Sequence, residues 1–323
     1  MILKGKPLII VSHARSGSHF LINSIRQNAD NLFGVQNPAF GLDSLLVPGD
    51  DTASNNFLQW YRKTTSENKT PIIEAKCLLE DCVQFVKKMP KDRADVKIID
   101  HILKEGIFIN IIRDPRESLL SWYKLSKSGG AMTFSASNVR LAKLTYKDFY
   151  KLTNIHKLPH KDFSEYDTST VKYCAYHHYS WKKYVTNNKG YFVYYQDLNN
   201  NFDNSIFDVF SFLKKNYEYY KEWPKKCTRP PNAYKSRYYR KIGKIIRKFE
   251  NIFYSKFNKK IFKFFLNFDL HSLKNVIESS FFASQIPTIE KDYKPSNEIN
   301  EIILKEYNKA YKDYSGIDQG VFK

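Results

Sequence analysis

The stretch PLIIVSHARSGSHFLINSIRQN, Pro7 to Asn28, is the part of the sequence on which the fold prediction mainly rests. Its apolar run Leu8–Val11 is typical of a buried strand, and the small residues of Ser12–Gly17 predict a loop. From Ser18 onward, apolar residues recur at helical spacing, which predicts an amphipathic helix. A loop that leads from a strand into a helix leaves backbone N–H groups unpaired at the positive end of the helix dipole. Such a helix N-terminus can bind a phosphate or another oxyanion.

The side chains of this loop favour the same interpretation. Arg15 supplies a cation, and Ser16 and Ser18 supply hydroxyl donors. The loop does not match the pattern G-x-x-x-x-G-K-[ST], because it has one glycine and no lysine before Ser18. An ordinary nucleotide-hydrolysing site is therefore disfavoured. The alternative is a plain strand–turn–helix with a polar N-cap.

The charge balance of the chain indicates an anionic partner. Its 323 residues include 52 Lys and Arg against 33 Asp and Glu, a formal net charge of +19. This excess favours nucleic acid, anionic lipid, an acidic glycan or a highly phosphorylated cofactor, although the abundance of Lys, Asn, Tyr, Phe and Ile makes part of it compositional. The hydrophobic content of 42% and aromatic content of 16% are typical of a globular protein and exclude a disordered chain.

The cysteines and the N-terminus bear on the compartment. Cys77, Cys82, Cys174 and Cys227 lack the close spacing of metal ligands, which predicts reduced thiols in a cytosolic setting. The apolar run near the N-terminus is too short for a signal peptide or an anchor, and no other segment approaches a membrane span. We therefore expect a cytoplasmic protein, with peripheral membrane association as an open alternative.

Strands and helices are expected to alternate along the first two thirds of the chain. Besides the opening unit, the expected strands are 32–35, 71–76 and 107–112, a strand leading into a turn is expected at 190–198, and the expected helices are 55–67, 78–88, 94–105, 168–186 and 203–215. Residues 39–53 are expected to form a loop, and 299–316 a final helix. The alternation predicts an α/β fold with a central, mostly parallel sheet flanked by helices, and ligands at the carboxyl ends of its strands.

A second stretch with chemical content is IFINIIRDPRESLLSWYKLS, Ile107 to Ser126. Arg113 follows the expected strand, and Pro115 suits the first turn of a helix. Ser121 lies eight positions after Arg113, just over two helical turns, so the two side chains can converge on one anion. The alternative is an Arg–Asp helix cap and a serine packed in a helix.

Together these stretches resemble the sulfotransferases that use 3′-phosphoadenosine 5′-phosphosulfate (PAPS). The segment Arg15–Ser18 is similar to the R-S-G-[ST] form of their 5′-phosphosulfate loop, common in carbohydrate and bacterial members. Arg113–Ser121 is similar to their 3′-phosphate motif, R-[DN]-P-[RK]-x-x-x-x-S. A third segment, Tyr195–Leu198, resembles their Y-E-D-L segment, with Gln196 in place of the Glu.

The resemblance covers roughly residues 7–216 and is thin between 37 and 105. It implies a P-loop NTPase-like fold. We expect one sulfotransferase-like domain over residues 1–323, with its core at about 7–216 and a basic helical extension at about 217–323.

The resemblance also implies an activity, the transfer of a sulfuryl group from PAPS to a hydroxyl of a carbohydrate or glycolipid, with no metal required. The residues implied to cradle the 5′-phosphosulfate are Arg15, Ser16, Gly17, Ser18, His19 and Phe20. Arg15 would stabilise the leaving group through its charge, because an arginine donates no proton at neutral pH. Arg113 and Ser121 would hold the 3′-phosphate. Tyr195 would contact the adenine, unless it is a core tyrosine.

The general base is harder to assign. Some carbohydrate enzymes use a Glu-Pro pair soon after the first helix, but the matching segment here, Gln36-Asn37-Pro38, has no titratable group. The end of the third expected strand, Glu74-Ala75-Lys76, is similar to the E-K or K-[ST] strand ends of other relatives. This resemblance implies that Glu74 deprotonates the acceptor and that Lys76 polarises the sulfuryl group. Residues two apart on a strand face the same side, so both side chains are expected on one face. A solvent-facing ion pair is the alternative. The histidines that remain are His19, more suited to phosphate binding, His101, more suited to a structural role, and His177-His178, which either pack a helix or border an acceptor pocket.

The basic segment 232–263 carries an apolar helical face among many Lys, Arg and Tyr residues. It would form a helix packed on the core, a surface for anionic lipid or glycan, or a nucleic-acid patch, but no motif supports a specific nucleic-acid partner. Two rival functions remain open for the chain. One is a P-loop nucleotide kinase or phosphotransferase, and the other is a non-catalytic nucleotide- or glycan-binding module.

Overall fold

The computed structural model describes residues 5–13, 15–35, 41–46, 51–127, 170–230 and 293–317. The chain divides into two compact units, the first formed by 1–118, 152–230 and 301–323, and the second by 119–151 and 231–300. In the described part of the second unit, the rings of Tyr123 and Tyr293 pack with their centroids 5.8 Å apart. The single domain over 1–323, with a core at about 7–216, stays a prediction. The basic segment 232–263 lies outside the described residues.

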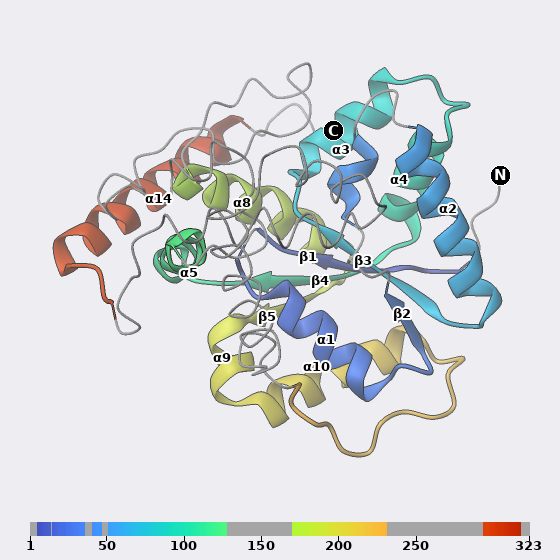
Figure 1. The fold of residues 1–323 in the computed structure, drawn as a ribbon. Helices are drawn as coiled ribbons and strands as arrows, with labels where there is room; N and C mark the ends of the chain where they lie inside the picture. The colour runs from blue at the N-terminus through green and yellow to red at the C-terminus, as the bar shows by residue number, and fades with distance from the viewer. Residues whose placement is uncertain are drawn as a thin grey trace, which may run out of the picture. The chain divides into compact units, whose positions relative to one another are not determined.

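The first unit is built on a five-stranded sheet in the order β2-β3-β1-β4-β5, with every neighbouring pair parallel (Figure 1). The strands are β1 (Leu8–Val11), β2 (Phe33–Val35), β3 (Thr70–Ala75), β4 (Ile107–Ile112) and β5 (Tyr191–Tyr194). The predicted α/β class and parallel sheet are confirmed. Because all strands run the same way, their carboxyl ends meet at one edge, and β1 lies between β3 and β4 at that edge.

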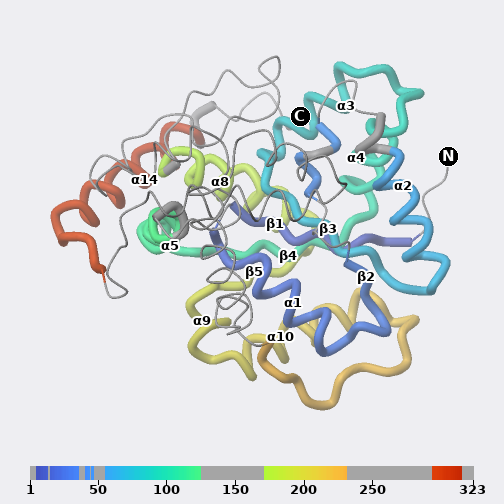
Figure 2. Tube along the Cα trace, in the orientation of Figure 1, coloured from blue at the N-terminus to red at the C-terminus, as the bar shows by residue number. Residues whose placement is uncertain are grey.

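Most of the helices begin and end close to the predicted positions, with α9 and the start of α2 as exceptions. They are α1 (Ser18–Asn28), α2 (Asp51–Ser66), α3 (Leu79–Lys88), α4 (Ala94–Glu105), α5 (Pro115–Lys127), α8 (Thr170–Asn187), α9 (Tyr195–Asn200), α10 (Phe202–Asn216) and α14 (Asn297–Ile317). The tube in Figure 2 follows β1 directly into α1, as the opening stretch predicted. Within the described residues, no helix combines the length and the apolarity needed to cross a membrane.

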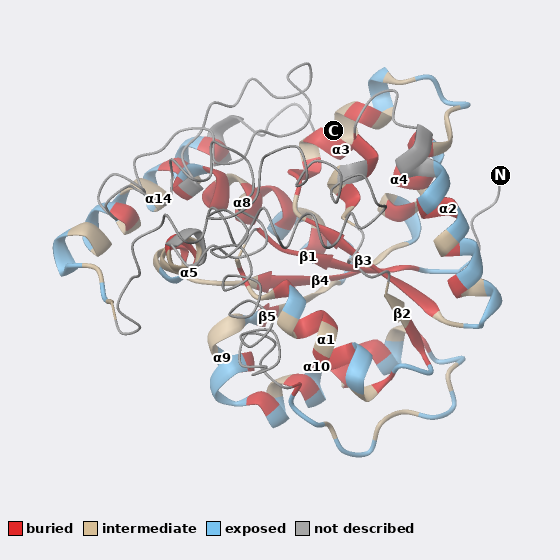
Figure 3. Ribbon diagram, viewed as in Figure 1, coloured by how far each residue is buried: buried red, intermediate tan, exposed pale blue. Residues whose placement is uncertain are grey.

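The sheet is buried on both faces, which explains its nearly continuous apolar strands (Figure 3). Alternate residues of β1 enter two different cores. Ile9 and Val11 join the core that includes residues of α2, α3, α4 and α8, whereas Leu8 and Ile10 join the core that includes residues of α1 and α10. All four side chains are fully buried.

Two local expectations were wrong. The expected loop 39–53 contains a short 3₁₀ helix, η1 (Leu42–Leu46), whose Leu42 and Leu45 enter the first core, and α2 already begins at Asp51. The expected turn after β5 is the helix α9, because a helical turn places the Leu198 side chain, which is fully buried, in the second core.

Candidate active site

The loop between β1 and α1 presents the amino end of a helix. Arg15 and Gly17 have positive φ angles of 66° and 105°. Gly17 is the N-cap of α1, it makes no side-chain capping hydrogen bond, and the first turn of α1 contains no acidic residue. The backbone N–H groups at the start of α1 are therefore suited to an anion from outside the helix.

Gly17 is required here for two reasons. Its φ angle lies in the left-handed region that side chains rarely adopt. A Cβ atom at this position would also lie 2.2 Å from Cδ2 of Tyr195. The Tyr195 ring thus packs directly on the loop, so the third motif segment contacts the first.

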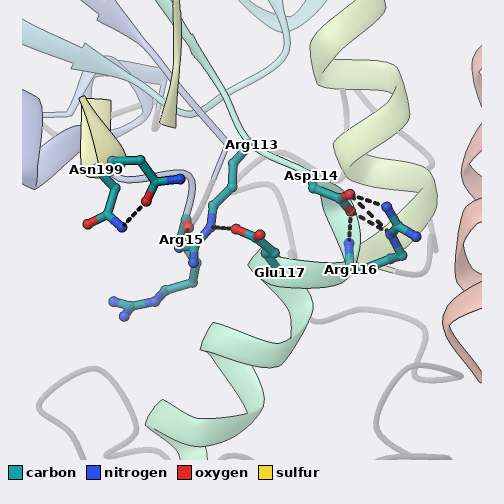
Figure 4. Close-up of polar contacts among 7 residues, drawn as sticks. Arg15, Arg113, Asp114, Arg116, Glu117 and Asn199 are labelled. Atoms are coloured by element: carbon teal, nitrogen blue, oxygen red, sulfur yellow. Dashed lines mark hydrogen bonds and ion pairs between the residues drawn. The ribbon is translucent and has the colours of Figure 1, made fainter. Parts of the chain in front are cut away.

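Arg113 connects all three motif segments, and Figure 4 shows it beside Arg15 and Glu117. Its Nη1 donates a hydrogen bond of 2.8 Å to the carbonyl oxygen of Arg15, and its guanidinium carbon lies 4.1 Å from the centroid of the Tyr195 ring. Its Nε lies 3.4 Å from Oε2 of Glu117. Because Arg15 has a left-handed backbone, the bond from Arg113 helps to hold the loop in an uncommon conformation.

Arg113 is a partly buried cation beside Arg15, Glu117 and Tyr195. Burial lowers its pKa, while electrostatic interactions with Tyr195 and Glu117 act in the opposite direction. An arginine in a protein stays protonated, so the desolvated charge is available to an anion. In Figure 4 the Arg15 side chain extends away from Arg113 and Glu117.

The Arg–Asp helix cap that the sequence left open does form, but it uses Arg116 instead of Arg113. The Arg116 N–H donates to Oδ1 of Asp114 at 2.8 Å, and Arg116 Nη2 lies 2.5 Å from Asp114 Oδ2. Burial favours the neutral acid, yet the hydrogen bonds and charge of Arg116 lower the pKa of Asp114. Ser121 lies further along α5, in the second unit, and its role stays a prediction.

Glu74 and Lys76 meet in an ion pair at the carboxyl end of β3. Lys76 Nζ lies 2.7 Å from Glu74 Oε2, with the Glu74 side chain 2% exposed. The Ser18 hydroxyl donates a short hydrogen bond to Glu74 Oε1, and the Ser12 hydroxyl lies 3.4 Å from the same oxygen. His19 Nε2 lies 3.7 Å from Glu74 Oε2. The pair is therefore not solvent-facing, and it is joined to the first turn of α1.

The surroundings of Glu74 favour its ionised form. Burial alone would raise its pKa, but the contact from His19 and the charge of Lys76 together lower the pKa to about 2. A carboxylate with so low a pKa is a weak proton acceptor at neutral pH. In this arrangement Glu74 acts as an ion-pair partner for Lys76.

Asp43 belongs to the same neighbourhood and was missed in the sequence. Its Oδ1 accepts the backbone N–H of Lys76 at 3.3 Å, and Gly41 forms a parallel bridge with Glu74. Burial raises the pKa of Asp43, partly offset by its own backbone N–H and by Lys76. The glycines and proline of segment 39–53 predicted a loop, so no sequence signal placed a carboxylate next to β3.

A cluster of three buried histidines lies beside the carboxyl end of β1. The rings of His13 and His178 are 4.8 Å apart between centroids, and His177 lies 6.2 Å from His13. Cys174 Sγ lies 3.5 Å from His13 Nδ1, and the Tyr307 hydroxyl lies 2.6 Å from His178 Nδ1. His177 and His178 therefore pack α8 against the loop and α14. Helix packing was one of the two roles expected for them.

His178 should make stability depend on pH. Burial, together with the nearby histidines and Lys182, holds its pKa well below 6.5. Below about pH 6.5 the unfolded chain therefore binds a proton at His178, whereas the folded chain does not. The free energy of unfolding falls as the pH falls. The titratable and charged groups around it are His13, Cys174, His177, Lys182 and Tyr307.

The measurement is urea unfolding of the wild type and His178→Gln at pH 7 and pH 5. Between these values the wild type should lose more unfolding free energy than the variant, by up to about 1.4 kcal/mol for each pH unit below 6.5. The variant keeps an oxygen that can accept from Tyr307, so the comparison isolates the proton. Equal losses in the two proteins would contradict the assignment.

Arg229 is a further cation near the loop that the sequence did not reveal. Its guanidinium carbon lies 5.3 Å from the Phe20 ring centroid and 5.8 Å from that of Phe202, and its Nη2 donates to Asn199 Oδ1 at 2.8 Å. The preceding residue, Thr228, donates its N–H to the Asn28 side chain. This segment follows no periodic pattern, so only the folded chain brings Arg229 to Phe20.

His101 lies at the opposite end of the sheet. Its Nε2 is 3.2 Å from the carbonyl oxygen of Gly5, which precedes β1, and 3.4 Å from the Tyr61 hydroxyl. This position fits the structural role. Among the described residues, no group of three or more His, Cys, Asp or Glu side chains is arranged to hold a metal ion.

The fold and the site together define an α/β protein with an oxyanion loop at the carboxyl edge of a parallel sheet. A family model of the sulfotransferase domain matches residues 6–261. The chain belongs to the sulfotransferase family, and its reaction is sulfotransfer. A comparison with curated proteins finds no match.

Proposed function

We propose that this protein transfers the sulfuryl group of PAPS to a hydroxyl of a carbohydrate or glycolipid. The observation that carries the proposal is the position of Arg113, which bonds the Arg15 carbonyl and stacks on Tyr195. A cation that touches the oxyanion loop and an aromatic ring suits a donor with two phosphate positions and a base. ATP has no 3′-phosphate and does not need this arrangement.

The loop has features that fit a bound phosphosulfate. The buried Ser16 hydroxyl has no hydrogen-bond partner in the part of the chain that the structure describes, which is costly unless a ligand or water satisfies it. We assign the 5′-phosphosulfate to Arg15, Ser16, Gly17, Ser18, His19 and Phe20. Arg113 and Ser121 bind the 3′-phosphate, and Tyr195 contacts the adenine.

The reaction needs charge stabilisation and one proton transfer. The acceptor oxygen bonds to sulfur as the bond from sulfur to the bridging oxygen breaks, and adenosine 3′,5′-bisphosphate leaves. Arg15 stabilises the charge on the leaving phosphate, and Lys76 polarises the sulfuryl oxygens. Glu74 takes the proton of the acceptor hydroxyl. No metal takes part in this proposal.

The acceptor class rests on the R-S-G-S form of the loop and on the charge of the chain. The formal net charge of +19 favours an acidic glycan or the headgroup region of an anionic membrane over a neutral small molecule. The basic segment 232–263 would contact such an acceptor. No specific nucleic acid is part of the proposal.

Thermal unfolding with three nucleotides tests the donor. Adenosine 3′,5′-bisphosphate at 100 times its Kd should stabilise the protein by about 2.7 kcal/mol, a shift of several degrees in Tm. ADP and AMP at the same concentration should give much smaller shifts, because they lack the 3′-phosphate. Equal shifts with all three would favour the nucleotide kinase and refute the PAPS proposal. Release of labelled sulfate from PAPS onto a panel of glycans and glycolipids then identifies the acceptor, and binding without transfer to any of them would favour the non-catalytic module.

A further inference from the structure

Both carboxylate oxygens of Glu74 contact groups at the start of α1 and the end of β3. Oε1 accepts from the Ser18 hydroxyl and lies 3.4 Å from the Ser12 hydroxyl. Oε2 lies 2.7 Å from Lys76 Nζ and 3.7 Å from His19 Nε2. The carboxylate is 2% exposed, so it is a buried anion whose charge these donors compensate.

Three of these donors are the ones that a phosphosulfate would use. Ser18 and His19 form the first turn of α1, and Lys76 is the cation at the neighbouring strand end. The Glu74 carboxylate therefore contacts the same hydroxyl, imidazole and ammonium groups that the phosphosulfate of the donor would contact. The two negative groups compete for these three partners.

We propose that Glu74 is an internal anion which the donor displaces from Ser18, His19 and Lys76, so that donor binding converts Glu74 from an ion-pair partner into a proton acceptor. The inference rests on the proposed function, because it assumes that a phosphosulfate or a 5′-phosphate binds at this loop.

The direction of the effect follows from the surroundings of Glu74. Burial is the largest influence on its pKa and acts upward, and the contacts with His19 and Lys76 reverse it to about 2. When these two partners turn to the donor, burial and the donor's negative charge remain, so the pKa rises. The charged groups that face Glu74 are Lys76 just after β3, His19 on α1 and Asp43 on η1. Asp43 is present with and without the donor, so it does not contribute to the change.

The coupling explains how a carboxylate with a low pKa can serve as a base. Before the donor binds, Glu74 holds Lys76 and Ser18 in place. After the donor binds, the same carboxylate has lost its compensating partners, and it gains affinity for the proton of the acceptor hydroxyl. The site becomes basic only when the 5′-anion of the nucleotide occupies the loop.

Thermodynamic linkage makes the coupling measurable. If donor binding raises the pKa of Glu74, the complex takes up a proton in the range between the free and bound pKa values. Affinity for adenosine 3′,5′-bisphosphate must then increase as the pH falls, by up to tenfold per pH unit. Glu74→Gln removes the competing anion, so this variant should bind the bisphosphate about tenfold more tightly than the wild type at pH 7.

The experiment is titration calorimetry of adenosine 3′,5′-bisphosphate binding from pH 4.5 to 7.5, in two buffers of different ionisation enthalpy. The ligand's own phosphates also titrate, but their contribution cancels in the ratio of wild-type to Glu74→Gln affinities. This ratio should rise toward low pH, and the wild type should take up more protons than the variant. Proton uptake by the wild type is a readout that does not depend on how well the variant folds.

Asp43→Asn is the matched control. It removes a negative charge from the same neighbourhood while leaving Ser18, His19 and Lys76 bound to Glu74, and its Oδ1 can still accept the Lys76 N–H. It should keep the wild-type proton uptake. A ratio that is constant with pH, weaker binding by Glu74→Gln, or the same gain in both variants would overturn the coupling alone. No bisphosphate binding by the wild type or the variants would overturn the proposed function and the coupling with it.

Discussion

Arg113→Lys should weaken the binding of adenosine 3′,5′-bisphosphate by about 100-fold, which corresponds to about 2.8 kcal/mol. A lysine keeps the charge but loses the planar fork of donors. The hydrogen bond to the Arg15 carbonyl and the stacking on Tyr195 both depend on that fork. The variant therefore loses a phosphate ligand and also loosens the loop whose left-handed residue Arg113 holds.

The measurement is bisphosphate affinity by calorimetry, with thermal unfolding of the ligand-free protein to separate binding from folding. Arg116→Lys is the matched control, because Arg116 lies three residues away and pairs with Asp114 in the helix cap. Its affinity should stay within about twofold of the wild type, since surface pairs of this kind contribute little. Wild-type affinity in Arg113→Lys would refute the role of Arg113.

Lys76→Met should lower kcat by about 100- to 1,000-fold, the usual cost of removing one group that stabilises transition-state charge. It should also destabilise the protein by roughly 2–3 kcal/mol, near the low end for breaking a buried pair, because Glu74 stays buried without its cation. Loss of Lys76 removes an influence that lowers the pKa of Glu74, so part of this destabilisation appears as a raised pKa.

The double variant Lys76→Met/Glu74→Gln separates the two effects. Removing the unpaired carboxylate should restore most of the lost stability, because two neutral side chains need no charge compensation. Turnover should remain low, because neither the polarising cation nor the base is present. Steady-state kinetics and urea unfolding of Lys76→Met and the double variant check both results. Wild-type turnover in Lys76→Met would contradict the role of Lys76.

The sequence was sufficient for the sheet because its signals are local. The strand β1 is a continuous apolar run, β4 is apolar except for Asn110, and α4 ends at Glu105 just before Gly106. Residues that share an element or adjoin it, such as Glu74 and Lys76, could be paired from spacing alone. The class of fold and the position of the oxyanion loop followed from these signals.

The rest of the site depends on contacts between distant segments, which carry no local pattern. Arg113 was expected to bind a phosphate, but its hydrogen bond to the Arg15 carbonyl requires two strands to be neighbours and one loop residue to have a positive φ. Asp43 reaches Lys76 because Gly41 bridges to β3, although the surrounding residues have the composition of a surface loop. His13 meets His178 only because α8 packs on the end of β1.

The helix α14 lies beyond the segment that matches the sulfotransferase family. The family match ends at residue 261, yet Tyr311 and Tyr314 pack on Tyr179 and Tyr176 of α8 at ring distances of 5.2 and 4.7 Å. The Tyr307 hydroxyl forms a hydrogen bond with Nδ1 of the buried His178. A chain shortened to end at residue 261 would lack α14, and water would then reach the α8 residues next to the loop. The family match is therefore shorter than the part of the chain that packs around α8.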